Sequence, residues 1–412
     1  MDTEVVVHRI GSNSPLCRTS KFALFRWPEM TLMEQPSSYL AHLGRRSPSI
    51  ATSRNSAYAL SYWFNFCRAA DIDWQHSSID DLYDYKTALE TTVSQKTGAR
   101  RSAGTSYQYV GAVVEFYDFA AGRCWYAGDI RKSEAPQRAI RADHDKLAHT
   151  KSGALPTRKR SPIAQKRNRS GTMIKPLSIG SLQRLLSEMG PDANDAPAGS
   201  SVRNRLIADW GWAVGLRISE ILSLRADQFS DLVGDPSVPW VHFSIEVLGK
   251  GNKLRRVSVP SWLIEHTQIY VRGERQRCVA LGRTSEERLF VSTADSKSPG
   301  QGITPRRVEA IFGAACLRAG LFVNVRRLDP ETGLMCLRQV PAHCVHDLRH
   351  TYAVLTYHAE VTQGNSEPWK KIQAQLGHSS LKTTTDIYLE YVNAHNDFRN
   401  ASIRDLVGLS RR

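Results

Sequence analysis

The apolar periodicity of the chain breaks off between Asp129 and Lys175, and this interruption constrains the fold more than any other feature of the sequence. Its second half, Pro156–Lys175, holds seven Lys and Arg side chains and no acidic residue. A charge run of this kind is usually a solvated linker, and on a basic chain it can also follow phosphates. Both interpretations stay open. Because 412 residues are too many for one ordinary domain, we expect two domains joined by a basic linker at residues 128–175.

The segment before the linker is predicted to be a helical domain. Apolar side chains recur there at three- and four-residue steps, as they do on one face of an amphipathic helix. We therefore expect a bundle of four or five helices over residues 36–127, with the aromatic rings in its core. Residues 1–35 are expected to form an N-terminal extension, in which Glu4–Ile10 can form a short strand. The two stripes are Tyr58, Tyr62, Trp63, Phe66 and Cys67, and then Tyr107, Val110, Val114 and Tyr117.

The segment after the linker, residues 176–395, is predicted to be an α+β domain. Its strands should be joined at Gly249–Asn252, where glycines supply the positive φ that a tight hairpin turn requires. The fold class that follows is mainly α with a small antiparallel β-sheet. The expected elements are helices at Arg203–Val214, at Ile218–Leu224 and from Thr304-Pro305, strands at Trp240–Val247 and Lys253–Val259, and mainly helices to Arg412 with a polar break at Gln363–Pro368.

Composition points to a polyanionic partner in a reducing compartment. The net charge of +15 and the pI of about 9.6 favour DNA, RNA or an anionic membrane surface, although a basic protein without such a partner stays open. No stretch approaches the roughly 20 apolar residues of a membrane helix, and the N-terminus lacks a signal-peptide layout. Seven scattered cysteines are typical of reduced thiols. We expect a cytoplasmic, nucleoid-associated protein.

Residues suited to phosphate chemistry follow one another along the second domain. Arg217 lies in Gly215-Leu216-Arg217-Ile218-Ser219-Glu220, and a lysine, Lys250, lies in the hairpin turn. His346 and Arg349 are three residues apart, so a helix brings them to one face. His378 follows, and Tyr388 comes ten residues after it. Each residue alone is also compatible with an ordinary ion pair or a packed side chain.

Taken together, these side chains suit one reaction. Arginine forks match phosphate oxygens and stabilise the charge that grows in a transition state. A tyrosine becomes a useful nucleophile only beside strong positive charge or a base. The acidic residues nearby occur singly, which disfavours a two-metal nuclease site. The set predicts attack of a tyrosine on a phosphodiester with no metal and no cofactor.

Four motifs resemble the signature boxes of the tyrosine recombinases and phage integrases, in the same order. They are G-L-R-I-S-E, V-L-G-K-G-N-K, H-D-L-R-H-T and L-G-H-S-S-L-K-T-T-T-D-I-Y. The resemblance covers residues 176–395 as a catalytic domain, and residues 36–127 are similar in position to the core-binding domain of that family. It implies a site-specific DNA recombinase of a mobile genetic element.

The resemblance also implies a role for each residue. Arg217 and Arg349 would bind the scissile phosphate, and Lys250 would protonate the leaving 5′ oxygen. His346 would act as general acid and base. Tyr388 would form a 3′-phosphotyrosine, which retains the energy of the phosphodiester, so that religation needs no ATP.

Further residues would contact the phosphate, support an arginine or compete for one of these roles. His378 would donate to a non-bridging oxygen, and Glu220 would support the first arginine. Lys253 is the rival of Lys250, because it lies in the same turn. Tyr352 and Tyr391 are the rivals for the nucleophile. The interval from Arg349 to His378 is longer than in compact members of the family.

The implied partner is double-stranded DNA at recombination sites, bound in a tetrameric synapse with or without accessory DNA-bending proteins or a partner recombinase. The tail at residues 396–412 carries Ile403, Leu406 and Val407 on one helical face. We expect it to reach a neighbouring protomer, and docking on its own domain is the alternative. Two other functions stay open, a type IB-like DNA topoisomerase and a catalytically inactive architectural DNA-binding protein.

Overall fold

The computed structural model of the protein describes residues 4–10, 21–46, 49–94, 98–128, 130, 174–233, 238, 241–249, 253–329 and 331–377. The chain divides into two compact units, which are described separately: Met1–Ser170 with Arg327–Cys336, and Gly171–Arg326 with Leu337–Arg412. Most of the predicted basic linker and the whole predicted tail lie outside the described residues.

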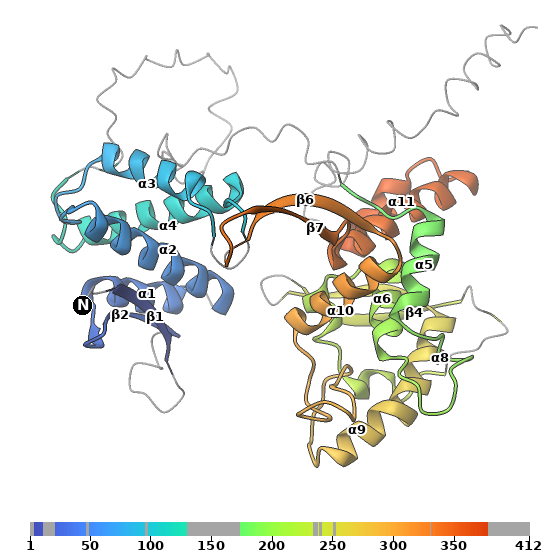
Figure 1. The fold of residues 1–412 in the computed structure, drawn as a ribbon. Coiled ribbons are helices and arrows are strands. Elements are labelled where there is room, and N and C mark those ends of the chain that lie inside the picture. Colours follow the sequence, from blue (N-terminus) through green and yellow to red (C-terminus); the bar gives the residue numbers. More distant parts are fainter. Residues whose placement is uncertain are drawn as a thin grey trace, which may run out of the picture. The chain divides into compact units, whose positions relative to one another are not determined.

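The first unit contains the predicted helical bundle, with a small sheet beside it (Figure 1). Its long helices begin where serine side chains replace the missing helical partners of the first N–H groups. Ser49 accepts from the amide of Thr52, and Ser78 and Asp81 form a capping box. The elements are β1 (Glu4–Arg9), β2 (Phe22–Trp27), β3 (Thr31–Leu32), α1 (Glu34–Arg46), α2 (Ile50–Ala69), α3 (Ile79–Thr91) and α4 (Ala103–Ala121).

The N-terminal strands share the core of the bundle. The predicted strand at Glu4–Ile10 is present as β1, and it pairs antiparallel with β2. Val5, Phe22 and Leu24 are buried in the same cluster as the helices. The side chain of Asn65 bonds both backbone polar groups of Val5, at 2.8 and 2.9 Å. The structure therefore differs from the expected N-terminal extension at residues 1–35.

The first aromatic stripe was assigned partly to the wrong face of its helix. Trp63 is fully buried, but Tyr58 and Tyr62 are 46% and 42% exposed. The buried face of α2 instead follows Ala57, Leu60 and Phe64 at steps of three and four. A residue next to this face is rotated by about 100° around the helix axis, which carries it toward solvent.

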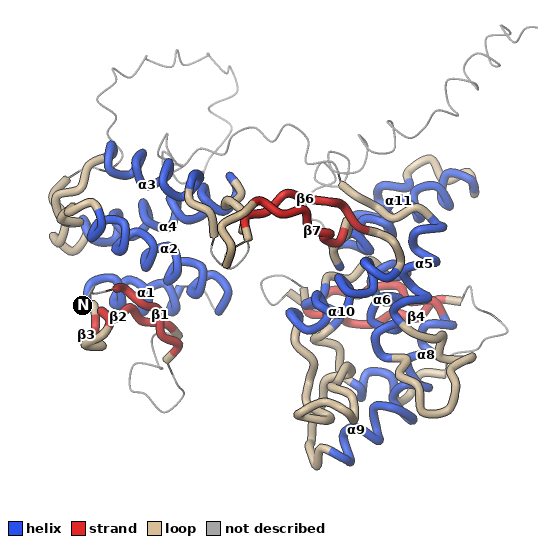
Figure 2. Tube along the Cα trace, in the orientation of Figure 1, coloured by secondary structure: helices blue, strands red, loops and turns tan. Residues whose placement is uncertain are grey.

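The second unit is the predicted α+β domain (Figure 2). α6 forms at the predicted residues, and β4 and β5 pair antiparallel as predicted. Thr304 caps α10, and the polar break separates α11 from α12. None of the helices within the described ranges combines the length and apolar character that crossing a membrane requires. The elements are α5 (Ile179–Met189), α6 (Arg203–Val214), α7 (Ile218–Ile221), the 3₁₀ turn η4 (Ala226–Phe229), β4 (His242–Leu248), β5 (Leu254–Pro260), α8 (Ser261–Tyr270), the π-helical turn η5 (Val271–Arg275), α9 (Gln276–Leu281), α10 (Pro305–Arg318), α11 (Val345–Thr362) and α12 (Pro368–Leu376).

A second hairpin occupies residues that were expected to be helical. β6 (Phe322–Leu328) and β7 (Met335–Pro341) form a two-stranded sheet. The turn between them is closed by the amide of Asp329, which donates to the Leu334 carbonyl at 2.8 Å, and Gly333 takes a φ of +68°. The helical prediction was wrong here because both strands are largely exposed and carry no alternating buried pattern, so that only the turn glycine marked a hairpin.

The packing of α6 against α11 positions the site. Trp210 of α6 and Leu348 of α11 are buried in one cluster. A methyl group on Gly211 would lie 2.9 Å from a methyl carbon of Leu348, so the glycine permits the close approach of the two helices. This approach places the end of α6 next to Arg349, the residue that follows Leu348.

Candidate active site

Arg217 is fixed at the start of α7 by Glu220. α6 ends at Gly215, whose φ of +76° turns the chain, and Arg217 is the N-cap of the next helix. The backbone amide of Arg217 donates to Glu220 Oε2 and its Nη1 donates to Glu220 Oε1, both at 2.9 Å. Glu220 is 1% exposed, whereas the Arg217 side chain is 29% exposed. The predicted pairing of these two residues is therefore present.

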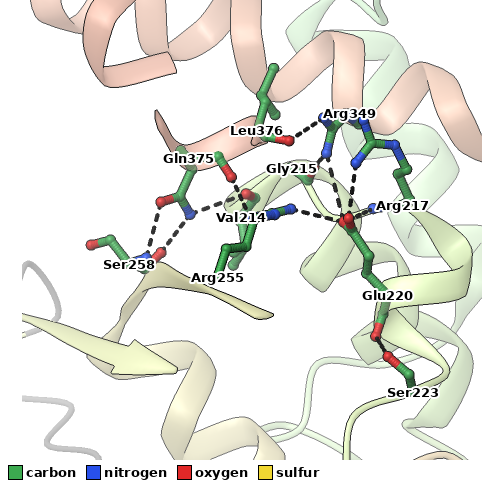
Figure 3. A network of polar contacts seen from close by, with 10 residues as sticks. All are labelled: Val214, Gly215, Arg217, Glu220, Ser223, Arg255, Ser258, Arg349, Gln375 and Leu376. Atoms are coloured by element: carbon green, nitrogen blue, oxygen red, sulfur yellow. Dashed lines mark hydrogen bonds and ion pairs between the residues drawn. The ribbon is translucent and has the colours of Figure 1, made fainter. Parts of the chain in front are cut away.

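Arg349 reaches the same carboxylate from α11 (Figure 3). Its Nη1 lies 3.8 Å from Glu220 Oε2, and its side chain is 1% exposed. The same nitrogen donates to the Gly215 carbonyl and Nη2 donates to the Leu376 carbonyl, both at 2.6 Å. These carbonyls stand at the ends of α6 and α12, where helix dipoles favour a cation. The two predicted arginines thus meet at one carboxylate.

Arg255 is a third arginine at this carboxylate, and the sequence prediction missed it. Its Nη2 donates to Glu220 Oε2 at 2.9 Å, and its Nη1 donates to the Gln375 carbonyl at 2.7 Å. The residue lies opposite Val247 in the β4–β5 pairing. The alternation of side chains along a strand could have revealed it. Val257 and Val259 follow Arg255 at steps of two and are buried, so Arg255 lies on the same inward face.

The side chain of Gln375 ties the end of α12 to two other elements. Its Oε1 accepts from the Ser258 amide at 3.0 Å, and its Nε2 donates to the carbonyls of Ser258 and Val214 at 2.8 and 3.2 Å. α12 ends at Gly377 with a φ of +66°. The residue after Gly377 is His378, so the network holds the chain immediately before one of the predicted site residues.

The centre of the site carries excess positive charge. Three guanidinium groups and one carboxylate leave a formal excess of two positive charges, in surroundings where Glu220 and Arg349 are almost completely buried. Charge of one sign in a low-dielectric environment attracts the opposite charge. This arrangement is suited to an anion that arginine forks can bind, such as a phosphate.

His346 lies beside this charge, one turn before Arg349 on α11. The residue keeps contact with solvent, but partial desolvation of its imidazole lowers the pKa, and the nearby Arg349 and Arg217 lower it further. Its ring meets that of His350 edge to face, with 4.8 Å between centroids. Burial, with the neighbouring His346, lowers the pKa of His350 to about 4. A neutral imidazole at His346 can accept a proton.

An accessible hollow of about 500 Å³ adjoins Arg217 and His346. Its other walls are mainly apolar and include Phe312, Pro341 and Val345. Arg217 and His346 both carry predicted roles at a phosphate, and the hollow gives a ligand access to these two side chains. Lys250, His378 and Tyr388 lie outside the described residues, as does the rival Tyr391. The rival Lys253 is exposed, and burial raises the pKa of the rival Tyr352.

The sequence pattern of the phage integrase family matches residues 182–395, just over half of the chain. The chain belongs to this family, which confirms the resemblance of its motifs. Among its relatives is a tyrosine recombinase XerC of Anoxybacillus flavithermus, 27% identical over 211 residues, which are 49% of this chain and 57% of that protein. A tyrosine recombinase XerD of Vibrio cholerae is 27% identical over 247 residues, 60% of this chain and 62% of that protein. The matches thus span little more than half the length of these relatives.

A solved structure supports the fold over most of the chain. It is the XerH site-specific recombinase bound to palindromic difH substrate, a post-cleavage complex. The TM-score is 0.51 with 17% sequence identity, and the match covers 89% of this chain and 85% of that one. The fold class is therefore that of this family, mainly α with small antiparallel sheets.

Proposed function

We propose that the protein is a site-specific DNA recombinase that breaks and rejoins strands through a 3′-phosphotyrosine. The observation that carries this proposal is the convergence of Arg217 and Arg349 on the buried carboxylate of Glu220. Such a cluster favours a phosphodiester ligand whose negative charge grows during substitution. Double-stranded DNA is the proposed partner. The XerH recombinase, which was solved with its difH substrate in a post-cleavage complex, supports this choice by family likeness.

In the proposed reaction, the phenol oxygen of Tyr388 attacks the scissile phosphorus. A bond forms between this oxygen and phosphorus, and the bond from phosphorus to the 5′ oxygen breaks. His346 accepts the phenol proton, and Lys250 gives a proton to the leaving oxygen. Arg217, Arg349 and His378 contact the non-bridging oxygens. A 5′-hydroxyl of the partner strand then attacks the phosphotyrosine and gives its proton to Lys250, while His346 returns a proton to the phenolate of Tyr388 as it leaves. One phosphodiester is broken and one is formed, so no ATP or metal enters the balance.

The nucleophile is tested with a nicked half-site taken from the DNA that flanks the gene. The wild-type protein should form a covalent protein–DNA adduct, visible after denaturation. Tyr388→Phe should bind the same DNA and form no adduct, because it lacks the attacking oxygen. Tyr391→Phe is the matched control and should react normally. An adduct that persists in Tyr388→Phe and disappears in Tyr391→Phe would assign the nucleophile to Tyr391.

The proton donor is tested with a substrate that carries sulfur at the 5′ bridging position. A thiolate leaves without a proton, so Lys250→Ala should cleave the ordinary substrate roughly 10²-fold slower, within the range of general acid catalysis, and the thio substrate almost normally. Lys253→Ala is the control and should cleave both substrates well. Equal defects of Lys250→Ala on the two substrates would remove Lys250 from the acid role.

The synapse and the tail form the second part of the proposal. We propose that four protomers assemble on two DNA sites and that residues 396–412 link neighbouring protomers. Deletion of these residues should leave DNA binding intact and abolish the four-protomer complex in gel-shift experiments. A truncated protein that unfolds as a monomer would show that the tail packs on its own domain. Relaxation of supercoiled plasmid without two-site recombination would instead indicate a type IB topoisomerase.

A further inference from the structure

We infer that Arg255 is a positioning residue of this site, which holds Glu220, and through it Arg217, in register with the chain segments that precede Lys250 and His378. The inference rests on the proposed recombinase function and deepens it. Arg255 is not assigned to contact DNA. Its place in the reaction is to keep the separate phosphate-binding groups in one arrangement.

The first observation is the face of the strand on which Arg255 lies. Residues at steps of two point to the same face of a strand, and Val257 and Val259 are buried in the core. Arg255 therefore occupies an inward position, whereas its neighbour Arg256 points outward with a side chain that is 76% exposed. An inward charge is costly unless it is paired and hydrogen-bonded, so its partners define its role.

The second observation is that the two terminal nitrogens of Arg255 serve different elements. Nη2 binds Glu220, the carboxylate that fixes Arg217 from α7, and Nη1 binds the Gln375 carbonyl at the end of α12 (Figure 3). The rigid guanidinium plane fixes the geometry between these two partners. A lysine has one nitrogen on a flexible stem and cannot reproduce this two-sided geometry. The side chain thus sets the position of α7 relative to the end of α12.

The third observation is that Arg255 lies beside two glycines that border predicted catalytic residues. A methyl group on Gly377 would lie 2.6 Å from Nε of Arg255 and 2.7 Å from its Cδ. A methyl group on Gly249 would lie 3.8 Å from the same Nε. In the sequence, Gly249 immediately precedes Lys250 and Gly377 immediately precedes His378. One side chain therefore lies against the chain on the approach to both residues.

The test compares Arg255→Gln and Arg255→Lys with the matched control Arg256→Gln on the nicked half-site. Arg256 pairs with exposed Glu246 at 3.4 Å, so its loss should leave the cleavage rate within about twofold of wild type. At saturating DNA, Arg255→Gln should form adduct about 10- to 100-fold more slowly, because misplacing reacting groups by about 1 Å can cost on the order of 10² in rate. Arg255→Lys should recover little of this loss. DNA affinity should change by less than about threefold in all variants, since the effect lies in positioning.

A double-mutant cycle separates positioning from simple loss of structure. Arg217→Lys should slow cleavage less in the Arg255→Gln background than in the wild-type background, because Arg217 is already displaced there. Multiplicative effects of the two changes would overturn the inference, and so would near-normal cleavage by Arg255→Gln. If the glutamine variant does not fold, Arg255→Lys keeps the positive charge beside Glu220 and carries the same comparison. Failure of the wild-type protein to form any adduct would instead reject the proposed function.

Discussion

The two units of the protein bury different kinds of polar side chain. Among the described residues, the buried polar side chains of the first unit are serines: Ser53, Ser56, Ser77 and Ser106. In the second unit they include six charged residues: Arg203, Asp209, Glu220, Asp347, Arg349 and Glu360. Removing one ion from water costs several kcal/mol even after relaxation, so the second unit bears a large penalty that the first avoids.

The first unit is held by aromatic packing instead. Trp63, Tyr85, Phe116 and Tyr117 are at most 1% exposed, and their rings pack edge to face. The polar tips are satisfied by neutral partners. Trp63 Nε1 donates to Tyr117 Oη at 3.1 Å, and Tyr117 Oη donates to the Trp74 carbonyl at 2.8 Å. A domain of this size can therefore fold around a core without buried charge.

Two buried carboxylates of the second unit, Asp209 and Glu220, differ in how their charge is matched. Asp209 is balanced, because Arg205 binds it at 3.1 Å and Trp212 donates to it at 2.8 Å. Glu220 is instead outnumbered by three arginines. A balanced pair needs no further ligand, whereas an excess of arginine is completed by an anion. An excess of arginine around one buried carboxylate therefore distinguishes the proposed phosphate site from the pair of Arg205 and Asp209.

The largest expected effect tests this distinction directly. Arg217→Ala and Arg349→Ala should each slow cleavage of the nicked half-site by on the order of 10²–10³, the usual loss for one donor that stabilises transition-state charge. Arg349→Ala should also lower the free energy of unfolding by about 2–6 kcal/mol, because it leaves the Gly215 and Leu376 carbonyls without their buried donor, at about 1–3 kcal/mol each.

Arg205→Ala is the matched control for that experiment. It breaks the balanced pair with Asp209 and should destabilise the second unit, yet the folded fraction should cleave DNA at the wild-type rate. The measurements are single-turnover adduct formation and denaturant unfolding on the same samples. If Arg205→Ala slows cleavage as much as Arg349→Ala does, the distinction between balanced and unbalanced charge fails.

The features that were predicted correctly are those that neighbouring residues in the sequence determine. The helix at Arg203–Val214 ends at a glycine with positive φ, and Glu220 lies one turn from Arg217, so both were recognisable from neighbouring residues. Arg255 was missed because its partners Glu220 and Gln375 are 35 and 120 residues away. No local pattern reports such contacts, although an arginine at an inward strand position is a warning sign.

Two errors in the fold prediction have a similar physical origin. The hairpin formed by β6 and β7 was missed because its strands are largely exposed and carry no alternating buried pattern, and each strand is stabilised by pairing with the other. Tyr58 and Tyr62 were placed in the core because their spacing is helical, but a helical stripe does not say which of two adjacent faces meets the bundle. The catalytic roles of all six site residues stay predictions: Arg217, Lys250, His346, Arg349, His378 and Tyr388.

A smaller effect is expected from acid. The folded-state pKa of His350 is about 4, below the ordinary value of 6.5, because burial and the neighbouring His346 disfavour its charged form. The unfolded state therefore binds more protons between these values, and stability falls as pH drops from about 6.5 toward about 4. The loss should reach roughly 3 kcal/mol at most. His346 shifts in the same direction.

Hydrogen exchange measured peptide by peptide locates this loss. Peptides of α11 should lose protection below pH 6, whereas peptides of α4 should keep theirs, because the buried Tyr117 of α4 is a phenol that is neutral in both the folded and the unfolded state at these pH values. His350→Gln should weaken the pH dependence in α11. Loss of protection in α4 before α11 would reverse the comparison and place the acid-sensitive part in the first unit.

The smallest effect belongs to the aromatic core of the first unit. Tyr117→Phe removes the hydroxyl that accepts from Trp63 Nε1, while Ser77 keeps the Trp74 carbonyl as a partner at 3.0 Å. One buried donor is left without its partner, which should lower the free energy of unfolding by about 1–2 kcal/mol. Tyr62→Phe is the control, because Tyr62 is 42% exposed, and it should change stability by less than about 0.5 kcal/mol. Neither variant should alter the single-turnover cleavage rate of DNA-bound protein, since neither touches the Glu220 cluster. A cleavage defect in Tyr117→Phe that persists when all protein is folded and bound to DNA would mean that the first unit contributes to the chemical step. The proposal that the first unit is only a scaffold, with the chemistry confined to the charged site of the second unit, would then be wrong.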